Sequence, residues 1–152
     1  MIRVAVLDGP LPVFEERPAP GGCGSEIVFH GRGRDTEKQR TIAALFYEHY
    51  EGMAQRELQR LAEQTAERFA LLDLICLHRV GDVPVGESSV RVVLRSKHRA
   101  EGIEALAWFV RELKRRVPIW KWGVTPTGER FPSTHCEGCA AAESEHHSHP
   151  PG

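Results

Sequence analysis

The residue whose position most suggests chemistry is Lys114, near the end of a predicted helix. At about 100° per residue, its side chain projects in line with Ile103, Ala107 and Val110, in the middle of an apolar stripe. A lysine there either reaches solvent or ends in a cleft. Further cations follow as far as Lys121, and a neighbouring positive charge lowers the pKa of a lysine. A neutral Lys114 amine could act as nucleophile or base, and a charged one could hold an anion. The alternative is structural, because cations are favoured in the last helical turn and a lysine stem covers apolar surface.

Two further basic segments, Gly31-Arg32-Gly33-Arg34 and Lys97-His98-Arg99, have a composition suited to binding an anion. In the first, glycines let the backbone approach a ligand and two guanidinium groups can bind phosphate in bidentate fashion. The second precedes the same helix, where backbone N–H groups favour an anion. Such charges are often only solvated, but together with the lysines they predict a small anionic ligand.

Length and composition limit the class of ligand. The 152 residues suffice for one domain with a buried core, and a formal net charge of −1 argues against nucleic-acid binding. No apolar run reaches the length of a membrane span, and no export signal accompanies the four Cys, so we expect a cytoplasmic protein with reduced thiols. Glycine motifs of nucleotide-binding folds and the nucleophile motif of α/β-hydrolases are absent from the sequence.

Two helices and several strands must position the basic residues. Apolar side chains recur at helical spacing over residues 52–69 and 101–116, and Pro118 ends the second helix. Short apolar or alternating runs predict strands at 2–7, 25–30, 42–49, 72–78, 89–94 and 119–122, with a terminal hairpin returning through 129–131. This order predicts an α+β fold with a mixed or antiparallel sheet and two main helices.

The composition changes after residue 132. We expect one domain over residues 1–132 and a flexible Cys/His-rich tail over residues 133–152. The tail contains a single C-x-x-C, and its histidines lie in a polar segment without a preformed site, so its zinc-ligand candidates are weak. These candidates are Cys136, Cys139, His146, His147 and His149. We therefore predict no metal site and no resident cofactor.

Six short segments together resemble the large, catalytic subunit of molybdopterin synthase, the molybdenum cofactor biosynthesis protein E family. The resemblance extends over nearly all of residues 1–131, with the segments in the family's order and at sensible spacing. They are Val28–Arg34, Tyr47–Met53, His78–Gly81, Ser96–Arg99, Leu113–Lys121 and Thr125–Arg130.

The resemblance implies a fold, a reaction and partners. The implied fold is an α/β hammerhead, and the implied assembly is a homodimer of large subunits within a heterotetramer. The implied partner is a small ubiquitin-like sulfur carrier, whose C-terminal Gly-Gly thiocarboxylate enters the active site. The implied substrate is cyclic pyranopterin monophosphate, which the enzyme converts to the dithiolene pterin, molybdopterin.

Carried over by position, the resemblance assigns catalysis to Lys114 and Lys121. The segments that match the lining of the pterin and phosphate pocket contain Arg32, Gly33, Arg34, His98, Arg99, Lys114, Lys121, Trp122 and Gly123.

Three departures stand beside the match. The family usually has a basic residue and a glutamate where this chain has Trp122 and Gly123, and a family arginine is replaced near His135. A Pro/Gly-rich stretch over residues 18–24 replaces the N-terminal helix that is common in relatives. The alternative function is therefore a catalytically degenerate relative that docks a carrier protein or a phosphorylated ligand without turnover.

Overall fold

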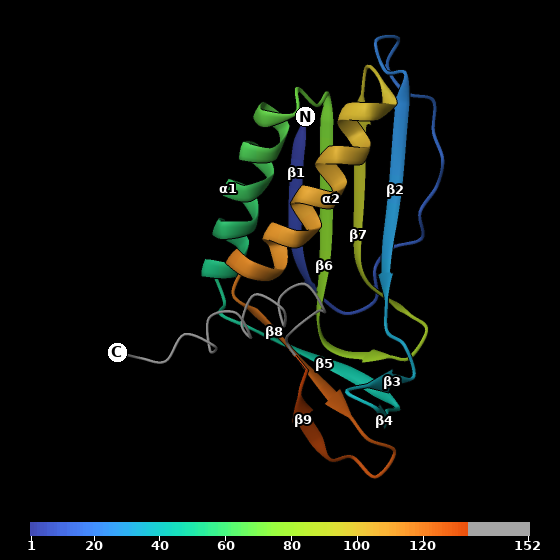
Figure 1. Cartoon of the computed structure of the whole chain (residues 1–152), viewed down its shortest axis with the longest axis vertical. Helices are drawn as coiled ribbons and strands as arrows, with labels where there is room; N and C mark the ends of the chain where they lie inside the picture. The colour runs from blue at the N-terminus through green and yellow to red at the C-terminus, as the bar shows by residue number, and fades with distance from the viewer. Residues whose placement is uncertain (134–152) are drawn as a thin grey trace.

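Two helices lie on one face of a sheet that has seven strands in the part of the chain described by the structure (Figure 1). The computed structural model describes residues 1–133. The helices are α1 (Met53–Arg68) and α2 (Arg99–Arg116). The strands are β1 (Ile2–Asp8), β2 (Ser25–Arg32), β3 (Thr36–Glu37), β4 (Arg40–Thr41), β5 (Ala44–His49), β6 (Asp73–Pro84), β7 (Ser88–Ser96), β8 (Ile119–Val124) and β9 (Arg130–Pro132). The predicted α+β class is confirmed.

The long strand β6 joins two parts of the sheet, which has the order β2-β7-β6-β5-β8-β9, with β1 parallel to β6. Its first residues, Asp73 to His78, pair with β7, whereas Gly81 to Pro84 pair with β5. Gly81 has φ +83°, a conformation that side chains rarely adopt, and the strand changes partner there. We call β1, β2, β7 and β6 up to Val80 the upper sheet. The lower sheet is β5, β8, β9 and β6 from Gly81 onward.

The main core lies between the upper sheet and the two helices. On α2 the buried residues are Gly102, Ala105, Phe109 and Leu113, at intervals of three and four. Ile103, which belongs to the predicted apolar stripe, is 58% exposed, so the predicted phase of this helix is wrong. Apolar residues occupy a wide arc of α2, and only packing against the sheet determines which part of that arc is buried.

A second, smaller core fills the lower sheet. It consists of Ile42, Leu45, Val83 and Phe131, with partly buried neighbours around them. Gly123 of β8 pairs with Phe131, and a Cβ built at this glycine would lie 2.5 Å from the Cζ atom of the ring. The Phe131 ring therefore occupies the space that a side chain at residue 123 would need.

Residues 9–24 form no helix or strand and run along the outer side of β2 (Figure 1). This agrees with the prediction that a Pro/Gly-rich stretch stands in place of an N-terminal helix. The segment is held by Arg91, whose Nη2 donates to the Pro12 carbonyl at 2.6 Å, and by Phe14, whose ring meets His30 edge-on with centroids 6.4 Å apart.

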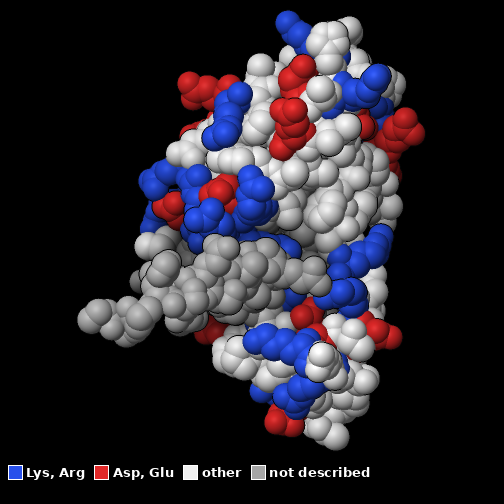
Figure 2. Space-filling model, viewed as in Figure 1, with Lys and Arg blue, Asp and Glu red and all other residues white. Residues whose placement is uncertain are grey.

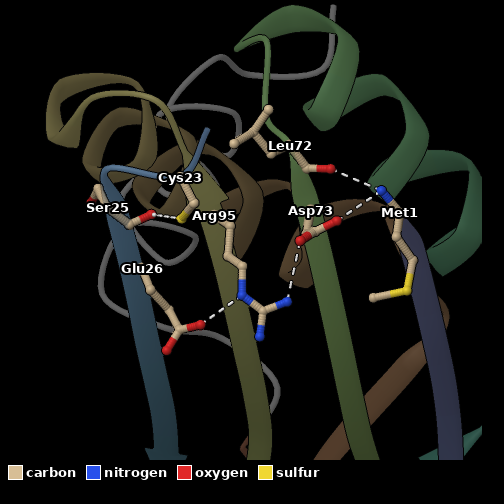
Figure 3. Close-up of polar contacts among 7 residues, drawn as sticks. All are labelled: Met1, Cys23, Ser25, Glu26, Leu72, Asp73 and Arg95. Atoms are coloured by element: carbon tan, nitrogen blue, oxygen red, sulfur yellow. Dashed lines mark hydrogen bonds and ion pairs between the residues drawn. The ribbon is translucent and has the colours of Figure 1, made fainter. Parts of the chain in front are cut away.

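Ion pairs join four strands at the end of the upper sheet that is distant from β8 (Figure 3). Arg95 of β7 bridges two acids, with Nε 2.6 Å from Glu26 and Nη1 3.2 Å from Asp73. The amino group of Met1 lies 2.9 Å from the same Asp73 and also donates to the Leu72 carbonyl. Each charge in this cluster has an opposite charge beside it, which offsets the cost of partial burial.

Candidate active site

Lys121, one of the two predicted catalytic lysines, lies within β8 beside a buried acid. Its Nζ atom is 3.1 Å from Oε1 of Glu37, and the two side chains are 22% and 9% exposed. Ser133 donates from Oγ to the other carboxylate oxygen at 2.5 Å, and its backbone N–H donates to the Lys121 carbonyl at 2.8 Å. Three segments of the chain, β3, β8 and the residue after β9, thus meet at the Glu37 carboxylate.

Glu37 reaches this position through a very short hairpin. It pairs with Arg40 across β3 and β4, and only Lys38 and Gln39 lie between them. Both of these turn residues have positive φ, +47° and +63°. Two-residue hairpin turns require this conformation, and Asn-Gly or Asp-Gly usually supplies it. The hairpin therefore carries no familiar sequence signal, and the sequence alone does not indicate Glu37.

A layer of buried polar side chains lies beside the pair. Tyr47 of β5 is directly opposite Lys121 in the β5–β8 register, its hydroxyl donates to Ser89 Oγ at 3.2 Å, and its ring meets that of His78 at 5.3 Å. Burial raises the pKa of Tyr47, the hydrogen bond that Tyr47 donates to Ser89 acts in the opposite direction, and the charge of Glu37 adds to the increase. Burial also lowers the pKa of His78 to about 4. The phenol and the imidazole are therefore uncharged at neutral pH.

The predicted basic segment Gly31–Arg34 is partly a continuation of β2. Arg32 is the last residue of that strand, and its Nη1 donates to the Gly86 carbonyl at 2.9 Å. Gly33 is buried, its carbonyl accepts from the Gly86 N–H at 2.9 Å, and a Cβ there would lie 3.0 Å from Leu45 Cδ1. Arg34 is exposed. The segment is thus fixed to the β6–β7 turn and to β5, and Arg34 remains accessible to an anion.

Trp122 and Gly123, which depart from the family pattern, both have structural contacts. The indole Nε1 of Trp122 donates to Oε2 of Glu48 at 3.1 Å. Gly123 is covered by the ring of Phe131, so a glutamate side chain at this position would displace that ring. The carboxylate beside the Lys121 ammonium comes from β3.

Lys114 is exposed in the last turn of α2, so of the two predicted outcomes, solvent or a cleft, its side chain reaches solvent. Within residues 1–133, its amine forms no ion pair or hydrogen bond with another side chain. Arg115 and Arg116 follow it, and basic side chains gather around this end of α2 (Figure 2). The lysine is therefore accessible to an anionic group that approaches this end of the helix.

His98 and Arg99 lie at the opposite end of α2 (Figure 1). His98 caps the helix, and its backbone N–H donates to a first-turn glutamate at 3.1 Å. At 1.5 Å per residue, the 16 residues from His98 to Lys114 span roughly 24 Å. The structure therefore brings Lys114 to the end of the molecule that carries Lys121, and it places His98 and Arg99 too far away to share one small ligand within a single chain.

Other kinds of site find little support in the described part of the chain. No group of three or more His, Cys, Asp or Glu side chains within residues 1–133 is arranged to hold a metal ion. Burial raises the pKa of the Cys76 thiol to about 12, so this thiol is protonated at neutral pH. Neither α1 nor α2 is apolar enough along its length to cross a bilayer. The weak tail candidates Cys136, Cys139, His146, His147 and His149 lie outside the described residues, as does His135.

Residues 12–116 match the family model described as "MoaE protein". The chain belongs to the MoaE family. A Pyrococcus abyssi relative, named molybdopterin synthase catalytic subunit, is 42% identical over 106 residues, which cover 70% of this chain and 72% of that protein. A Drosophila melanogaster relative of the same name is 34% identical over 80% of this chain, but the match spans only 34% of that longer protein.

Solved structures of the MoaE type have the same fold. The crystal structure of molybdopterin synthase from Staphylococcus aureus superposes with a TM-score of 0.74 at 24% identity, and the match covers 82% of this chain and 93% of that one. A complex of subunits 1 and 2 of the molybdopterin-converting factor from Helicobacter pylori matches with a TM-score of 0.61 at 25% identity, over 74% of this chain and 73% of that one.

The MoaE assignment confirms the family that the six segments predicted. It leaves open the roles of individual residues, which rest on the geometry of this chain. The segments predicted Lys121 but neither Glu37, which pairs with its ammonium, nor Ser133, which anchors that carboxylate. Ser133 was assigned to the predicted tail, yet it is fully buried, so the folded part of the chain extends at least to this residue.

Proposed function

We propose that this MoaE chain is the catalytic subunit of a molybdopterin synthase, a sulfurtransferase. It would transfer sulfur from the thiocarboxylated C-terminus of a small ubiquitin-like carrier subunit to cyclic pyranopterin monophosphate. The observation that carries the proposal is that Lys114 and Lys121, which the family resemblance assigns to catalysis, lie at the same end of the molecule. One is exposed at the end of a helix, and the other is held rigidly in a strand.

The chemistry suits such a site. A thiocarboxylate is already a sulfur nucleophile, so the protein need not generate one. It must neutralise two anions, the carrier terminus and the substrate phosphate, and hold them within attack distance. Lys114 would lie at the carrier terminus and stabilise developing negative charge or transfer protons. Lys121 would assist at the pterin carbon that receives sulfur, and Arg34 would bind the phosphate.

The separation along α2 bears on the assembly. If His98 and Arg99 bind the same phosphate as Arg34, they must come from a second copy of the chain, because roughly 24 Å of helix separates them from the Lys114 end. We therefore propose that each pterin site of the homodimer combines the lysines of one copy with His98 and Arg99 of the other. Two copies of the catalytic chain with two carriers would form the heterotetramer.

The deciding experiment mixes the purified chain with a thiocarboxylated carrier and cyclic pyranopterin monophosphate and assays dithiolene pterin. We expect product from the parent chain, and a loss of roughly 100-fold or more in Lys114→Ala and in Lys121→Ala. Co-expressed Arg99→Ala and Lys121→Ala chains should recover activity above that of either variant alone, because one site of the mixed dimer is then intact. Lys114→Ala at the parental rate would refute the role of this lysine.

A second function, a docking module without turnover, is favoured by one observation, namely that Trp122 and Gly123 replace the basic residue and the glutamate of the family. It predicts carrier binding without product in the same assay. The position of Glu37 argues against it, because a carboxylate lies 3.1 Å from the Lys121 ammonium although residue 123 is a glycine in this chain.

We propose a cytoplasmic location and no resident cofactor or metal. The catalytic domain would comprise the folded residues, and the Cys/His-rich tail would be dispensable for catalysis. A chain truncated after Ser133, which keeps that buried residue, is expected to retain the parental kcat. A truncated chain that folds but loses activity would show that the tail contributes to the site.

A further inference from the structure

The family resemblance assigns no role to Glu37, the acid beside Lys121. We propose that Glu37 is a positioning residue for the synthase reaction, which holds the Lys121 ammonium in its working place. This inference rests on the proposed function. It concerns a residue that lies on a different strand from Lys121 and 84 positions away in the chain.

The burial of Glu37 is the first support. A carboxylate that is 9% exposed is costly to desolvate unless each oxygen has a partner. Here Oε1 faces the Lys121 ammonium at 3.1 Å, and Oε2 accepts from Ser133. The backbone N–H of Ser133 is bonded to the Lys121 carbonyl in turn. The carboxylate is therefore anchored on both sides and forms a fixed counter-charge.

The second support is what a fixed counter-charge does for a lysine. A lysine side chain has four rotatable bonds, and ordering it costs roughly 2 kcal/mol of conformational entropy. An ammonium already held at 3.1 Å from a rigid acid has lost this freedom before the substrate arrives. Its charge then stabilises negative charge that develops in the transition state without further reorganisation.

The third support is the absence of a local alternative. The position two residues after Lys121 projects from the same face of β8, but it holds Gly123, and any side chain there would have to displace the Phe131 ring. The β3–β4 hairpin, with both turn residues at positive φ, brings a carboxylate to the same place from another direction.

The main test compares Glu37→Gln with a matched exposed control. Glutamine keeps the shape and removes the charge, and we expect kcat to fall about tenfold or more while KM for the pterin changes less than about twofold. Glu129→Gln makes the same change of net charge at an exposed acid 3.4 Å from Arg40, and we expect parental kcat and KM. Ser133→Ala removes one anchor but leaves the charge pair, so its fall in kcat should be smaller than that of Glu37→Gln.

A double-mutant cycle separates positioning from a direct role. If Glu37 acts through Lys121, adding Glu37→Gln to Lys121→Ala should change the residual single-turnover rate less than about twofold. Should Glu37→Gln fail to fold, as judged by its thermal transition, Glu37→Asp is the substitute. It keeps the charge on a shorter stem, and the same fall in kcat is expected.

Three results would overturn the inference. They are parental kcat in folded Glu37→Gln, a full effect of Glu37→Gln in the Lys121→Ala background, and a fall in Ser133→Ala as large as that in Glu37→Gln. An inactive parent chain would instead overturn the proposed function itself, and this inference with it.

Discussion

Two groups of ion pairs, at opposite ends of the sheet, differ in how they use charge. In the upper sheet, Arg95 bridges Glu26 and Asp73, and a planar guanidinium contacts both acids (Figure 3). In the lower sheet, Glu37 pairs with the ammonium of Lys121, at the end of a flexible stem. The first arrangement joins strands through a rigid fork, whereas the second fixes one charge beside a predicted reaction centre. At comparable burial, one group of ion pairs joins strands and the other lies at the proposed active site.

The largest expected effect tests the structural side of this comparison. Arg95→Leu leaves Asp73 and Glu26 partly buried without their shared cation, and we expect the free energy of unfolding to fall by about 3 kcal/mol. Chemical denaturation measures this fall, and kcat at a temperature well below the transition should stay parental. A fall below about 1 kcal/mol would show that the guanidinium bridge is not structural.

At the Lys121–Glu37 pair we expect a smaller loss of stability, which a second substitution reverses. Lys121→Met leaves the buried Glu37 carboxylate without its counter-charge, at a cost of about 2 kcal/mol. Adding Glu37→Gln removes that charge and should recover more than half of the lost stability in the same denaturation experiment. Activity should not recover, in contrast to stability. Additive losses of stability would show that the two side chains are not coupled.

The dependence of stability on pH involves the junction of the two regions, because His78 lies where β6 passes from one sheet to the other. Burial lowers its pKa to about 4, so the unfolded chain binds a proton below its ordinary value near 6.5 while the folded chain does not. Stability is then full above that value and falls as the pH decreases toward 4. We expect a loss of about 1–2 kcal/mol between pH 7 and pH 5, measured by denaturation at each pH, and a flatter profile in His78→Phe.

The carboxyl of Asp73 responds in a lower range. Burial opposes its ionisation, but the hydrogen bonds and charges of the Met1 amine and Arg95 outweigh burial and lower its pKa. Its stabilising contribution is present above the ordinary carboxyl value and is lost only as the pH falls through the lowered one. An Asp73→Asn variant should therefore match the parent's profile between pH 7 and pH 5. A changed slope in that range would contradict the assignment to His78.

The smallest effect is expected at the exposed Arg40–Glu129 pair, with side chains 44% and 67% exposed. Solvent screens such a pair, so Glu129→Gln should change the free energy of unfolding by less than about 0.5 kcal/mol. Chemical denaturation of Glu129→Gln in parallel with Lys121→Met compares the loss of an exposed ion pair with the loss of a buried one.

The sequence was sufficient for most of the fold. Periodicity located both helices and most main strands within a few residues, because these elements bury apolar faces with clear spacing. The strand predicted at residues 72–78 was too short, since β6 continues to Pro84 and pairs there with β5. Periodicity failed at α2, where Ile103 and Phe109 are equally apolar and only one of them faces the sheet. The exposure of Lys114 follows from that choice of face, which depends on tertiary packing rather than on spacing.

The candidate site was predictable only in part. The order of the six segments indicated Lys114 and Lys121, because family patterns are local in the chain. Glu37 and Ser133 could not be found in this way, since their contact joins positions 96 residues apart and depends on a turn of Lys38 and Gln39 without glycine. The position of His98 and Arg99 relative to the lysines also required the length of a folded helix.

The change of partner at Gly81 of β6 also orders the assembly of the molecule. The upper sheet contains the local β6–β7 hairpin, in which His78 pairs with Val90, whereas the pairing of Ala44 with Val124 in the lower sheet joins residues 80 positions apart, and β5 can pair with β6 only beyond the point where the upper sheet ends. Loop closure over such a separation is slow unless other contacts shorten it, so the upper sheet should form first and serve as the template. The amides of β8 should then exchange with solvent through partial openings that leave β7 protected, which makes the proposed active site the last part to fold and the first to open.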